Sequence, residues 1–126
     1  MYQKKTLPNL KCGLDVVGEV LYGKWKIRLL WFINEGHLRP GELQRKIPDA
    51  SRRVLNIQLK ELENHELVMR TIYPVMPPKV EYSLTDFGKT LIPVISAIGL
   101  WGDEHQEQLK RVIISSYQKT PEDFED

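Results

Sequence analysis

Four side chains that can contact DNA bases recur at three- to four-residue spacing: Arg53, Asn56, Ile57 and Lys60. At about 100° per residue they share one face of a helix. Arginine can bind guanine and asparagine can bind adenine through paired hydrogen bonds, while an aliphatic side chain can contact a thymine methyl group. The pattern is typical of a helix in the major groove of DNA. The alternative is an ordinary solvated face with one isoleucine, and the face alone favours that alternative.

The elements that precede this face in the sequence shift the interpretation from a solvated face toward DNA binding. The spacing predicts a recognition helix over residues 51–65, with Ser51 as its N-cap. A shorter helix begins at Arg39-Pro40, where the missing N–H of proline costs nothing, and it ends at Pro48. A short helix, a three-residue turn and a second helix form a helix-turn-helix, which favours DNA binding. Apolar residues opposite the exposed face should pack on the core: Leu43, Ile47, Leu55, Leu59 and Leu62.

A β-hairpin is predicted next, over residues 67–84. Residues 67–73 and 79–84 are rich in β-branched and aromatic types, which indicates two paired strands. The connection over residues 74–78 contains three prolines and should project as a stiff wing. Arg70 and Lys79 place positive charge on this wing, where phosphates or a minor groove would lie. Plain solubilising charge explains them equally well.

Two amphipathic segments flank this DNA-reading unit, which covers residues 39–85. The first is a short helix over about residues 12–23, followed by an apolar core helix over residues 25–33. The second is a helix over about residues 86–118, which Pro93 should bend rather than end. Such a helix is longer than a small domain needs, so we expect a second copy of the chain to cover it; a long core helix is the alternative. The predicted dimer interface comprises Leu14, Val17, Leu21, Leu91, Val94, Ile98, Trp101 and His105.

Length and composition predict one domain over residues 1–126, because 41% hydrophobic residues suffice for one modest core. Net charge is only +1, but bases gather in residues 1–30, including Lys4 and Lys5, and acids in residues 103–126. The acidic end from about residue 120 should be frayed. Without an apolar run of membrane length or a signal peptide, the sequence predicts a cytoplasmic protein with no membrane partner.

Other chemistries find little support in the sequence. His37, His65 and His105 lack the spacing of metal ligands, so no metal site is predicted. A glycine-rich phosphate loop, a nucleophile elbow and a pair of catalytic carboxylates are also missing from the sequence. We therefore predict a protein that is not an enzyme and carries no cofactor.

Cys12 is the one cysteine of the chain, and it allows two interpretations. Lys11 beside it and the start of the following helix provide the kind of surroundings that favour a reactive thiolate. Under that interpretation Cys12 is a redox or electrophile sensor. A lone cysteine is more often a small buried hydrophobic residue, and this alternative is the stronger of the two.

Several local motifs match those of one family. They are Gly23-Lys24-Trp25-Lys26 before the core helix, Gly41-Glu42-Leu43 and Ile47-Pro48 in the short helix, and Ser51-Arg52-Arg53-Val54-Leu55 with Leu59-Lys60-Glu61-Leu62 in the recognition helix. The wing adds Tyr73-Pro74 and Pro77-Pro78-Lys79-Val80-Glu81-Tyr82-Ser83-Leu84-Thr85, followed by Gly88. Through these motifs the chain resembles the HxlR-type winged-helix regulators, relatives of the MarR group, from Cys12 to Gly102.

The resemblance implies a mainly α fold with a small β-hairpin (α+β), a winged helix-turn-helix with N- and C-terminal dimerisation helices. It also implies a cytoplasmic homodimer on a pseudo-palindromic double-stranded DNA operator, usually a repressor and less often an activator. Some relatives use an N-terminal cysteine as a sensor, and a small-molecule or electrophile effector would fit that role. Asn56 stands where threonine is common, which indicates an altered base preference. The candidate DNA-binding residues are Arg39, Ser51, Arg52, Arg53, Asn56, Ile57, Lys60, Arg70 and Lys79.

A different class of function stays open. Winged helices also serve as protein-protein interaction modules that bind no specific DNA, and a fold does not fix a function. Such a module would use its wing and long helix to bind protein. The exposed face of Arg53, Asn56, Ile57 and Lys60 argues against this alternative.

Overall fold

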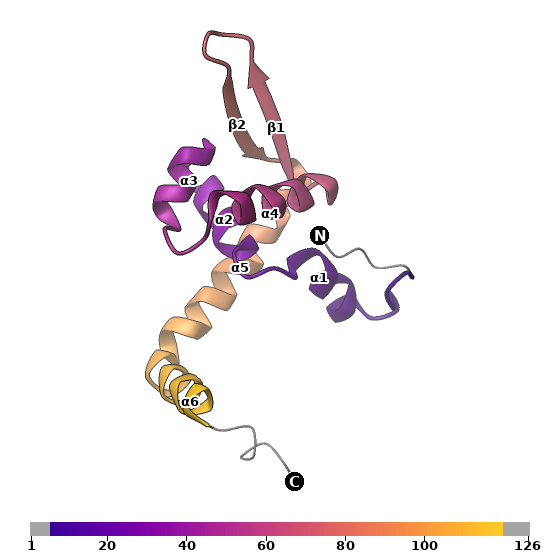
Figure 1. The fold of residues 1–126 in the computed structure, drawn as a ribbon. Helices are drawn as coiled ribbons and strands as arrows, with labels where there is room; N and C mark the ends of the chain where they lie inside the picture. Colours follow the sequence, from indigo (N-terminus) through magenta and orange to yellow (C-terminus); the bar gives the residue numbers. More distant parts are fainter. Residues whose placement is uncertain (1–5, 120–126) are drawn as a thin grey trace. The chain divides into compact units, whose positions relative to one another are not determined.

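The computed structural model of the chain describes residues 6–119. Lys4, Lys5 and the acidic end from residue 120 lie outside the described residues. The chain forms two compact units, with the boundary between Ile92 and Pro93. The prediction of one domain over residues 1–126 stays a prediction. In chain order the described elements are α1 (Gly13–Leu21), α2 (Lys26–Asn34), α3 (Pro40–Lys46), α4 (Arg52–Asn64), β1 (Val68–Tyr73), β2 (Lys79–Leu84), α5 (Asp86–Glu104) and α6 (Gln106–Gln118) (Figure 1).

The core of the first unit lies where α2, α3, α4 and the foot of the hairpin meet. Helix α2 is largely apolar and lies at its centre, as its sequence predicts. The leucines and isoleucine expected to face inward from α3 and α4 are all buried, which confirms the predicted orientation of both helices. The buried apolar side chains are Leu29, Leu30 and Ile33 of α2, Leu43 and Ile47 from α3 and its C-cap, Ala50 of the turn, Leu55, Leu59 and Leu62 of α4, and Leu67, Val68, Tyr82 and Leu84 of the hairpin foot.

Local hydrogen bonds fix the turn between α3 and α4. The Ser51 hydroxyl oxygen accepts the backbone N–H of Val54 at 3.1 Å, so Ser51 is the N-cap that the sequence predicts. Gln44 donates from Nε2 to the carbonyl oxygen of Ala50 at 2.6 Å, which ties the end of the turn back to α3. Pro40 occupies the first turn of α3 as expected.

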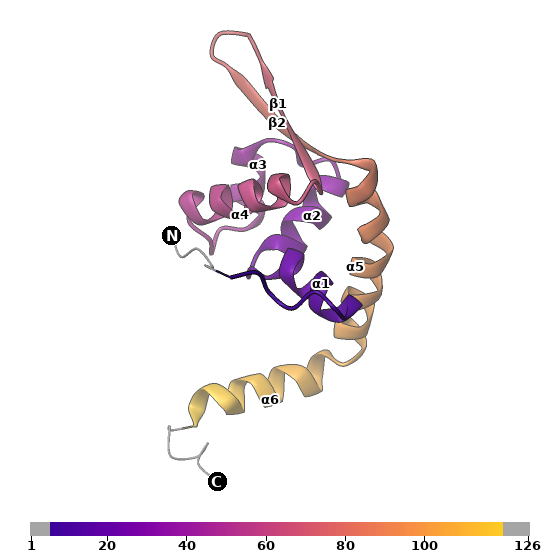
Figure 2. The same cartoon turned by 90° about the vertical axis from the view of Figure 1, so that its right-hand side faces the viewer.

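Strands β1 and β2 form an antiparallel hairpin with six residue pairs, from Val68↔Leu84 at the foot to Tyr73↔Lys79 at the far end. Figures 1 and 2 show this hairpin projecting from the helices as an arm. Beyond Val68 every residue of β1 is exposed. The order α2, α3, α4 and a projecting hairpin is the winged helix-turn-helix arrangement, in a chain that is mainly helical.

The hairpin foot is fastened to the start of α5. Thr85 donates its hydroxyl to the carbonyl oxygen of Glu66 at 2.6 Å, and the same hydroxyl oxygen accepts the N–H of Gly88 at 2.8 Å. Thr85 therefore caps α5 and at the same time holds the segment that follows α4. Gly88 lies directly against the carbonyl group of Leu67, where a side chain would not fit.

The prediction of one continuous helix over residues 86–118 is wrong. The helix stops at Glu104 and restarts at Gln106, because His105 has φ −112° and ψ 20°. The His105 ring stacks on Trp101 at 5.0 Å between centroids, and its Nδ1 lies 3.0 Å from the Trp101 carbonyl oxygen. The backbone N–H of His105 also donates to the Trp101 carbonyl oxygen at 3.1 Å, so the ring lies beside a helical hydrogen bond that is kept at the break. Pro93 lies within α5 without ending it.

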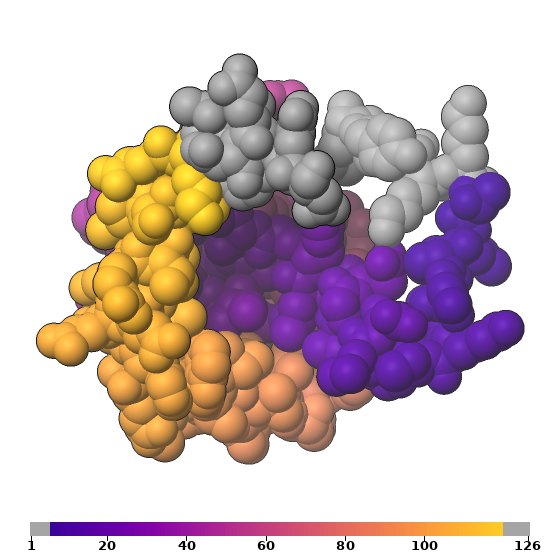
Figure 3. Space-filling model, turned by 90° about the horizontal axis from the view of Figure 1, so that it is seen from below, coloured from indigo at the N-terminus to yellow at the C-terminus, as the bar shows by residue number. Residues whose placement is uncertain are grey.

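The N-terminal helix is shorter than the predicted 12–23 segment. It spans Gly13–Leu21, and Cys12 is its N-cap. In the space-filling view of Figure 3 the α1 segment, in indigo, lies at the surface. None of the helices in the described part of the chain is long and apolar enough to cross a membrane.

Candidate nucleic-acid interface

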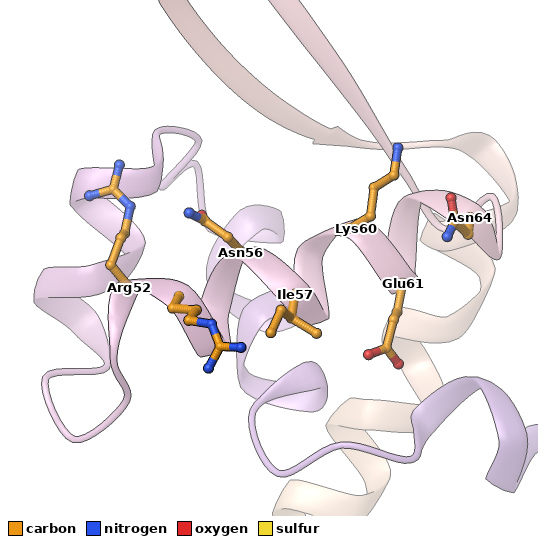
Figure 4. Close-up of a pocket in the computed structure, with 7 residues that line it drawn as sticks. Arg52, Asn56, Ile57, Lys60, Glu61 and Asn64 are labelled. Atoms are coloured by element: carbon orange, nitrogen blue, oxygen red, sulfur yellow. The ribbon is translucent and has the colours of Figure 1, made fainter. Parts of the chain in front are cut away.

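The face of α4 opposite its buried leucines is open to solvent. Arg53, Asn56 and Lys60 are exposed, whereas Ile57 is half-buried between them. Figure 4 shows labelled side chains of this face arranged along the helix, from Arg52 near its start to Asn64 near its end. Together they line a shallow groove of about 570 Å³, whose residues are Arg52, Arg53, Asn56, Ile57, Lys60, Glu61 and Asn64. The structure therefore brings guanidinium, amide and aliphatic groups together on one surface.

Two contacts from the start of α2 fix the orientation of α4. Lys26 is only 1% exposed, and its Nζ lies 2.8 Å from Oε2 of Glu61. The backbone N–H of Trp25 donates to Oε1 of Gln58 at 2.9 Å. Gln58 and Glu61 lie about one helical turn apart on α4, so the two contacts hold it against rotation about its axis. A buried ammonium without a partner is costly, so this ion pair favours one position of the exposed face.

Gly23 makes room for the Lys26 side chain. A Cβ at position 23 would lie 3.1 Å from Cδ and Cε of Lys26, and its φ of +148° also favours glycine. Sequence reasoning missed these positioning residues. The signal was a lysine at the start of a helix that is otherwise apolar and central, a place where an unpaired charge is rarely found.

A second groove, of about 410 Å³, separates α4 from the hairpin. Its rim carries the cations Arg52, Lys60 and Arg70 against one acid, Glu63. Lys60 Nζ is 3.6 Å from Oε1 of Glu63, an exposed pair of little energetic weight. A cleft with an excess of one charge attracts ions of the opposite sign, which suits the phosphate backbone of DNA. The other lining residues are Pro40, Asn56, Val80 and Tyr82.

Arg39 and Lys79, both candidate DNA-binding residues, do not line this groove. Arg39 Nε and Lys79 Nζ lie 3.7 Å and 3.9 Å from the same Glu81 Oε2. Along β2 the side chains of Lys79 and Glu81 lie on one face of the hairpin and that of Tyr82 lies on the other. Tyr82 pairs with Arg70 of β1, so these two side chains share a face. Because side chains alternate between the faces of a strand, Lys79 and Arg70 project from opposite faces of the wing. Sequence reasoning placed both on the hairpin but did not separate them.

The other candidate arginines, Arg52, Arg53 and Arg70, differ from Arg39 in this respect. Among residues 6–119, no carboxylate lies within ion-pair distance of Arg52, Arg53 or Arg70. Ser51 lies at the start of α4 as its cap, and its hydroxyl oxygen already accepts the N–H of Val54. A phosphate or a base edge would thus meet three guanidinium groups whose hydrogen-bond donors are not engaged by acids of the described residues.

The residues predicted for a dimer interface expose much apolar surface. In α1, Leu14 is 83% exposed, Val17 is exposed and Leu21 is half-buried. In α5, Leu91 is half-buried and Val94, Ile98 and Trp101 are exposed, while His105 lies at the break after α5. Sequence reasoning missed further exposed apolar residues in α5 and α6, namely Leu100, Ile113, Ile114 and Tyr117. Apolar surface of this extent is characteristic of protein interfaces.

Cys12 is exposed and carries a free thiol at the N-cap of α1. The prediction that favoured a buried cysteine is therefore wrong, because neither Cys12 nor any residue of the helix that it caps is buried. In the part of the chain that the structure describes, no three His, Cys, Asp or Glu residues gather as metal ligands.

Comparison with known proteins gives a consistent set of similarities. Residues 20–110 match the HxlR-like helix-turn-helix family. The chain is 41% identical over 102 residues to the uncharacterized HTH-type transcriptional regulator YkvN of Bacillus subtilis, covering 81% of this chain and 86% of that protein. The redox regulator HypR is similar in structure in two forms. The reduced form has a TM-score of 0.75 at 38% identity, covering 79% of this chain and 99% of that one. The oxidized form has a TM-score of 0.70 at 41% identity, covering 74% of this chain and 96% of that one.

Proposed function

Because the chain belongs to the HxlR-like helix-turn-helix family of transcriptional regulators, we propose that it binds a pseudo-palindromic operator as a homodimer and represses transcription there. The observation that carries this proposal is the exposed face of α4, held in one orientation by Lys26–Glu61 and flanked by a cationic groove. In the proposed complex α4 lies in the major groove, and the wing lies on the backbone or in a minor groove.

Base recognition falls to three side chains of α4. Arg53 donates two hydrogen bonds to a guanine, Asn56 bonds an adenine, and Ile57 contacts a thymine methyl group. The half-buried position of Ile57 supports the last role, because a partly fixed aliphatic side chain presents a defined contact. Arg52, Lys60 and Arg70 would follow the phosphates along the second groove, and Ser51 and Arg39 would contact the backbone near the first turns of α4 and α3.

The homodimer supplies the second reading surface. Adjacent half-sites on one face of DNA lie about 34 Å apart, so two copies of α4 must be held at that separation. The exposed apolar residues of α1 and of α5 are the surfaces that a second copy would cover. A dimer bound to an operator excludes other proteins from that stretch of DNA, and this exclusion is the basis of the proposed repression. We place this activity in the cytoplasm.

The test is a mobility shift with genomic fragments, including the region upstream of the protein's own reading frame, at two salt concentrations. Specific binding should weaken steeply as salt rises, since each neutralised phosphate releases counterions. Shuffled fragments of the same composition are the matched control. A protein-binding module of the same fold would show only feeble binding, equal for genomic and shuffled fragments, and that result would reject the proposal.

A redox or electrophile signal is a second part of the proposed function. The exposed Cys12 thiol at the start of α1 supports it, as does the similarity to the reduced and oxidized forms of HypR. Since Cys12 is the only cysteine in the sequence, oxidation to a disulfide requires a second subunit or a small thiol. Diamide should release the wild-type protein from DNA. Cys12→Ser should keep the DNA affinity but abolish the release, and release that persists in Cys12→Ser would end the idea.

A further inference from the structure

The tip of the wing is apolar and open to solvent. Residues 74–78 carry no charged side chain. Met76 is 94% exposed and Val75 is 55% exposed, and all five tip residues are exposed. Surface loops usually carry polar side chains, and apolar groups held in water favour a binding partner. The cations of the wing, Arg70 and Lys79, lie on the strands below the tip.

The tip is also stiff. Three of its five residues are prolines, whose rings fix the backbone angle φ. The N–H of Val75 donates to the carbonyl oxygen of Tyr73 at 2.9 Å, and Lys79 Nζ lies 5.5 Å from the centroid of the Tyr73 ring. A stiff loop loses little conformational entropy on binding, so it can hold an apolar side chain in contact with a partner at low cost.

The length of the wing matches a distance in DNA. Val68 at the foot lies in the core beside α4, and Tyr73 at the far end is five residues further along β1. At about 3.3 Å per residue the arm reaches roughly 17 Å from its foot. Half of a DNA helical turn of about 34 Å, the step from a major groove to the next minor groove, is also roughly 17 Å. If α4 lies in the major groove and the wing runs along the DNA axis, this length brings the tip level with the flanking minor groove.

Charge indicates which partner the tip meets. Arg70 lines the groove between α4 and the hairpin together with Arg52 and Lys60, so a phosphate strand held there runs along the wing. The tip above these cations has no charged or hydrogen-bond-donating side chain that could bind a phosphate, because it carries only proline, valine and methionine. Methionine and proline are among the side chains that wedge between base steps from the minor groove.

We propose that Met76 is a minor-groove wedge, which enters a base step beside each half-site and bends the DNA there. This role rests on the proposed DNA-binding function and adds a specificity-determining residue to it. The Met76 side chain makes no hydrogen bond to a base, so its preference for a DNA sequence depends on how easily the two base pairs of a step can be unstacked. Pyrimidine–purine steps such as TA open most easily, and a flanking TA step therefore binds more tightly than a GC step.

The experiment compares Met76→Ser with two controls on a DNA fragment selected by the wild-type protein. Met76→Leu keeps an apolar side chain at the tip, and Met69→Ser makes the same polar change at an exposed position near the foot of β1. Fluorescence anisotropy gives the affinity at two salt concentrations, and energy transfer between dyes at the DNA ends gives the bend. We expect Met76→Ser to bind about tenfold more weakly per half-site, as for loss of one buried apolar side chain at each.

The salt dependence separates a wedge from a charge contact. Met76 neutralises no phosphate, so the tenfold loss should be equal at both salt concentrations. Met76→Ser should also reduce the bend and lose the preference for a flanking TA step, while both controls behave like wild type. If the wild-type protein binds specifically but Met76→Ser has the same affinity and the same DNA bend, the wedge alone is overturned. A tip that binds a protein partner would give that result. Wild-type binding without sequence preference overturns the proposed function and the wedge together.

Discussion

Gly88 at the start of α5 provides a stringent test of how the wing is mounted. A Cβ added there would clash with the carbonyl oxygen of Leu67 and lie 3.0 Å from its carbonyl carbon. That carbonyl cannot move freely, because it accepts the N–H of Thr85 at 3.1 Å and lies 3.3 Å from the Thr85 hydroxyl. Alanine at position 88 must therefore push the hairpin foot and α5 apart.

The expected magnitude follows from two opposing terms. Forcing an extra methyl group into a filled site costs about 1 to 3 kcal/mol, and the fixed carbonyl of Leu67 places Gly88→Ala near the upper end. Alanine recovers about 0.5 to 1 kcal/mol over glycine inside a helix. The free energy of unfolding should therefore fall by about 2 kcal/mol, and the melting temperature by roughly 8 °C for a chain of this size.

The assay is chemical and thermal unfolding followed by circular dichroism, with Gly99→Ala in the same helix as the matched control. A Cβ at position 99 meets no heavy atom within 4 Å, so that variant should be neutral or about 0.5 to 1 kcal/mol more stable. The displaced wing should also weaken DNA binding by Gly88→Ala but not by Gly99→Ala. If Gly88→Ala were as stable as Gly99→Ala, the close approach of α5 to Leu67 would be refuted.

Three further substitutions test other parts of the account. Arg53→Ala should weaken specific DNA binding by about 1 to 3 kcal/mol in anisotropy titrations, and full retention of affinity would contradict the assigned face of α4. Ile98→Asp should give monomers in sedimentation and lose binding to a two-half-site operator; a monomer of undiminished affinity would contradict the dimer proposal. Ser51→Ala removes the cap of α4 and should lower the free energy of unfolding by about 1 kcal/mol in urea titrations, so wild-type stability in this variant would argue against the cap.

Local rules explain why much of the fold could be predicted from the sequence. Ser51 and Pro40 mark helix starts through their own chemistry, and the structure has helices starting at both places. The spacing of Leu55, Leu59 and Leu62 is enough to orient α4. The wing follows from two β-rich runs around a proline-rich connection. Each of these signals lies within a few residues of the feature that it predicts.

The features that sequence reasoning missed depend on contacts or on register. Lys26 and Glu61 are 35 residues apart, and only the packing of α2 on α4 brings them together. At the break His105 has φ −112° and its ring contacts the carbonyl of Trp101, whereas the apolar spacing of the sequence continues through it. Arg70 and Lys79 occupy opposite faces of the hairpin because of the strand register, which depends on how the five-residue tip closes.

The candidate site could also be predicted from the sequence in part. The exposure of Arg53, Asn56 and Lys60 follows from helical periodicity, and the structure has all three on the open face of α4. Their roles in binding DNA stay predictions. The cationic groove between α4 and the wing needed the three-dimensional arrangement, because Arg70 comes from a strand and Arg52 from a helix.

Selection of bound sequences from a random double-stranded DNA pool tests whether a symmetric dimer reads DNA through α4. We expect an enriched motif with two inverted half-sites whose centres lie about one helical turn, roughly 34 Å, or a multiple of it apart. Repeating the selection with Arg53→Ala should relax one base position in each half-site. A pool without an enriched motif, or with a single half-site, would contradict sequence-specific binding by a symmetric dimer through α4.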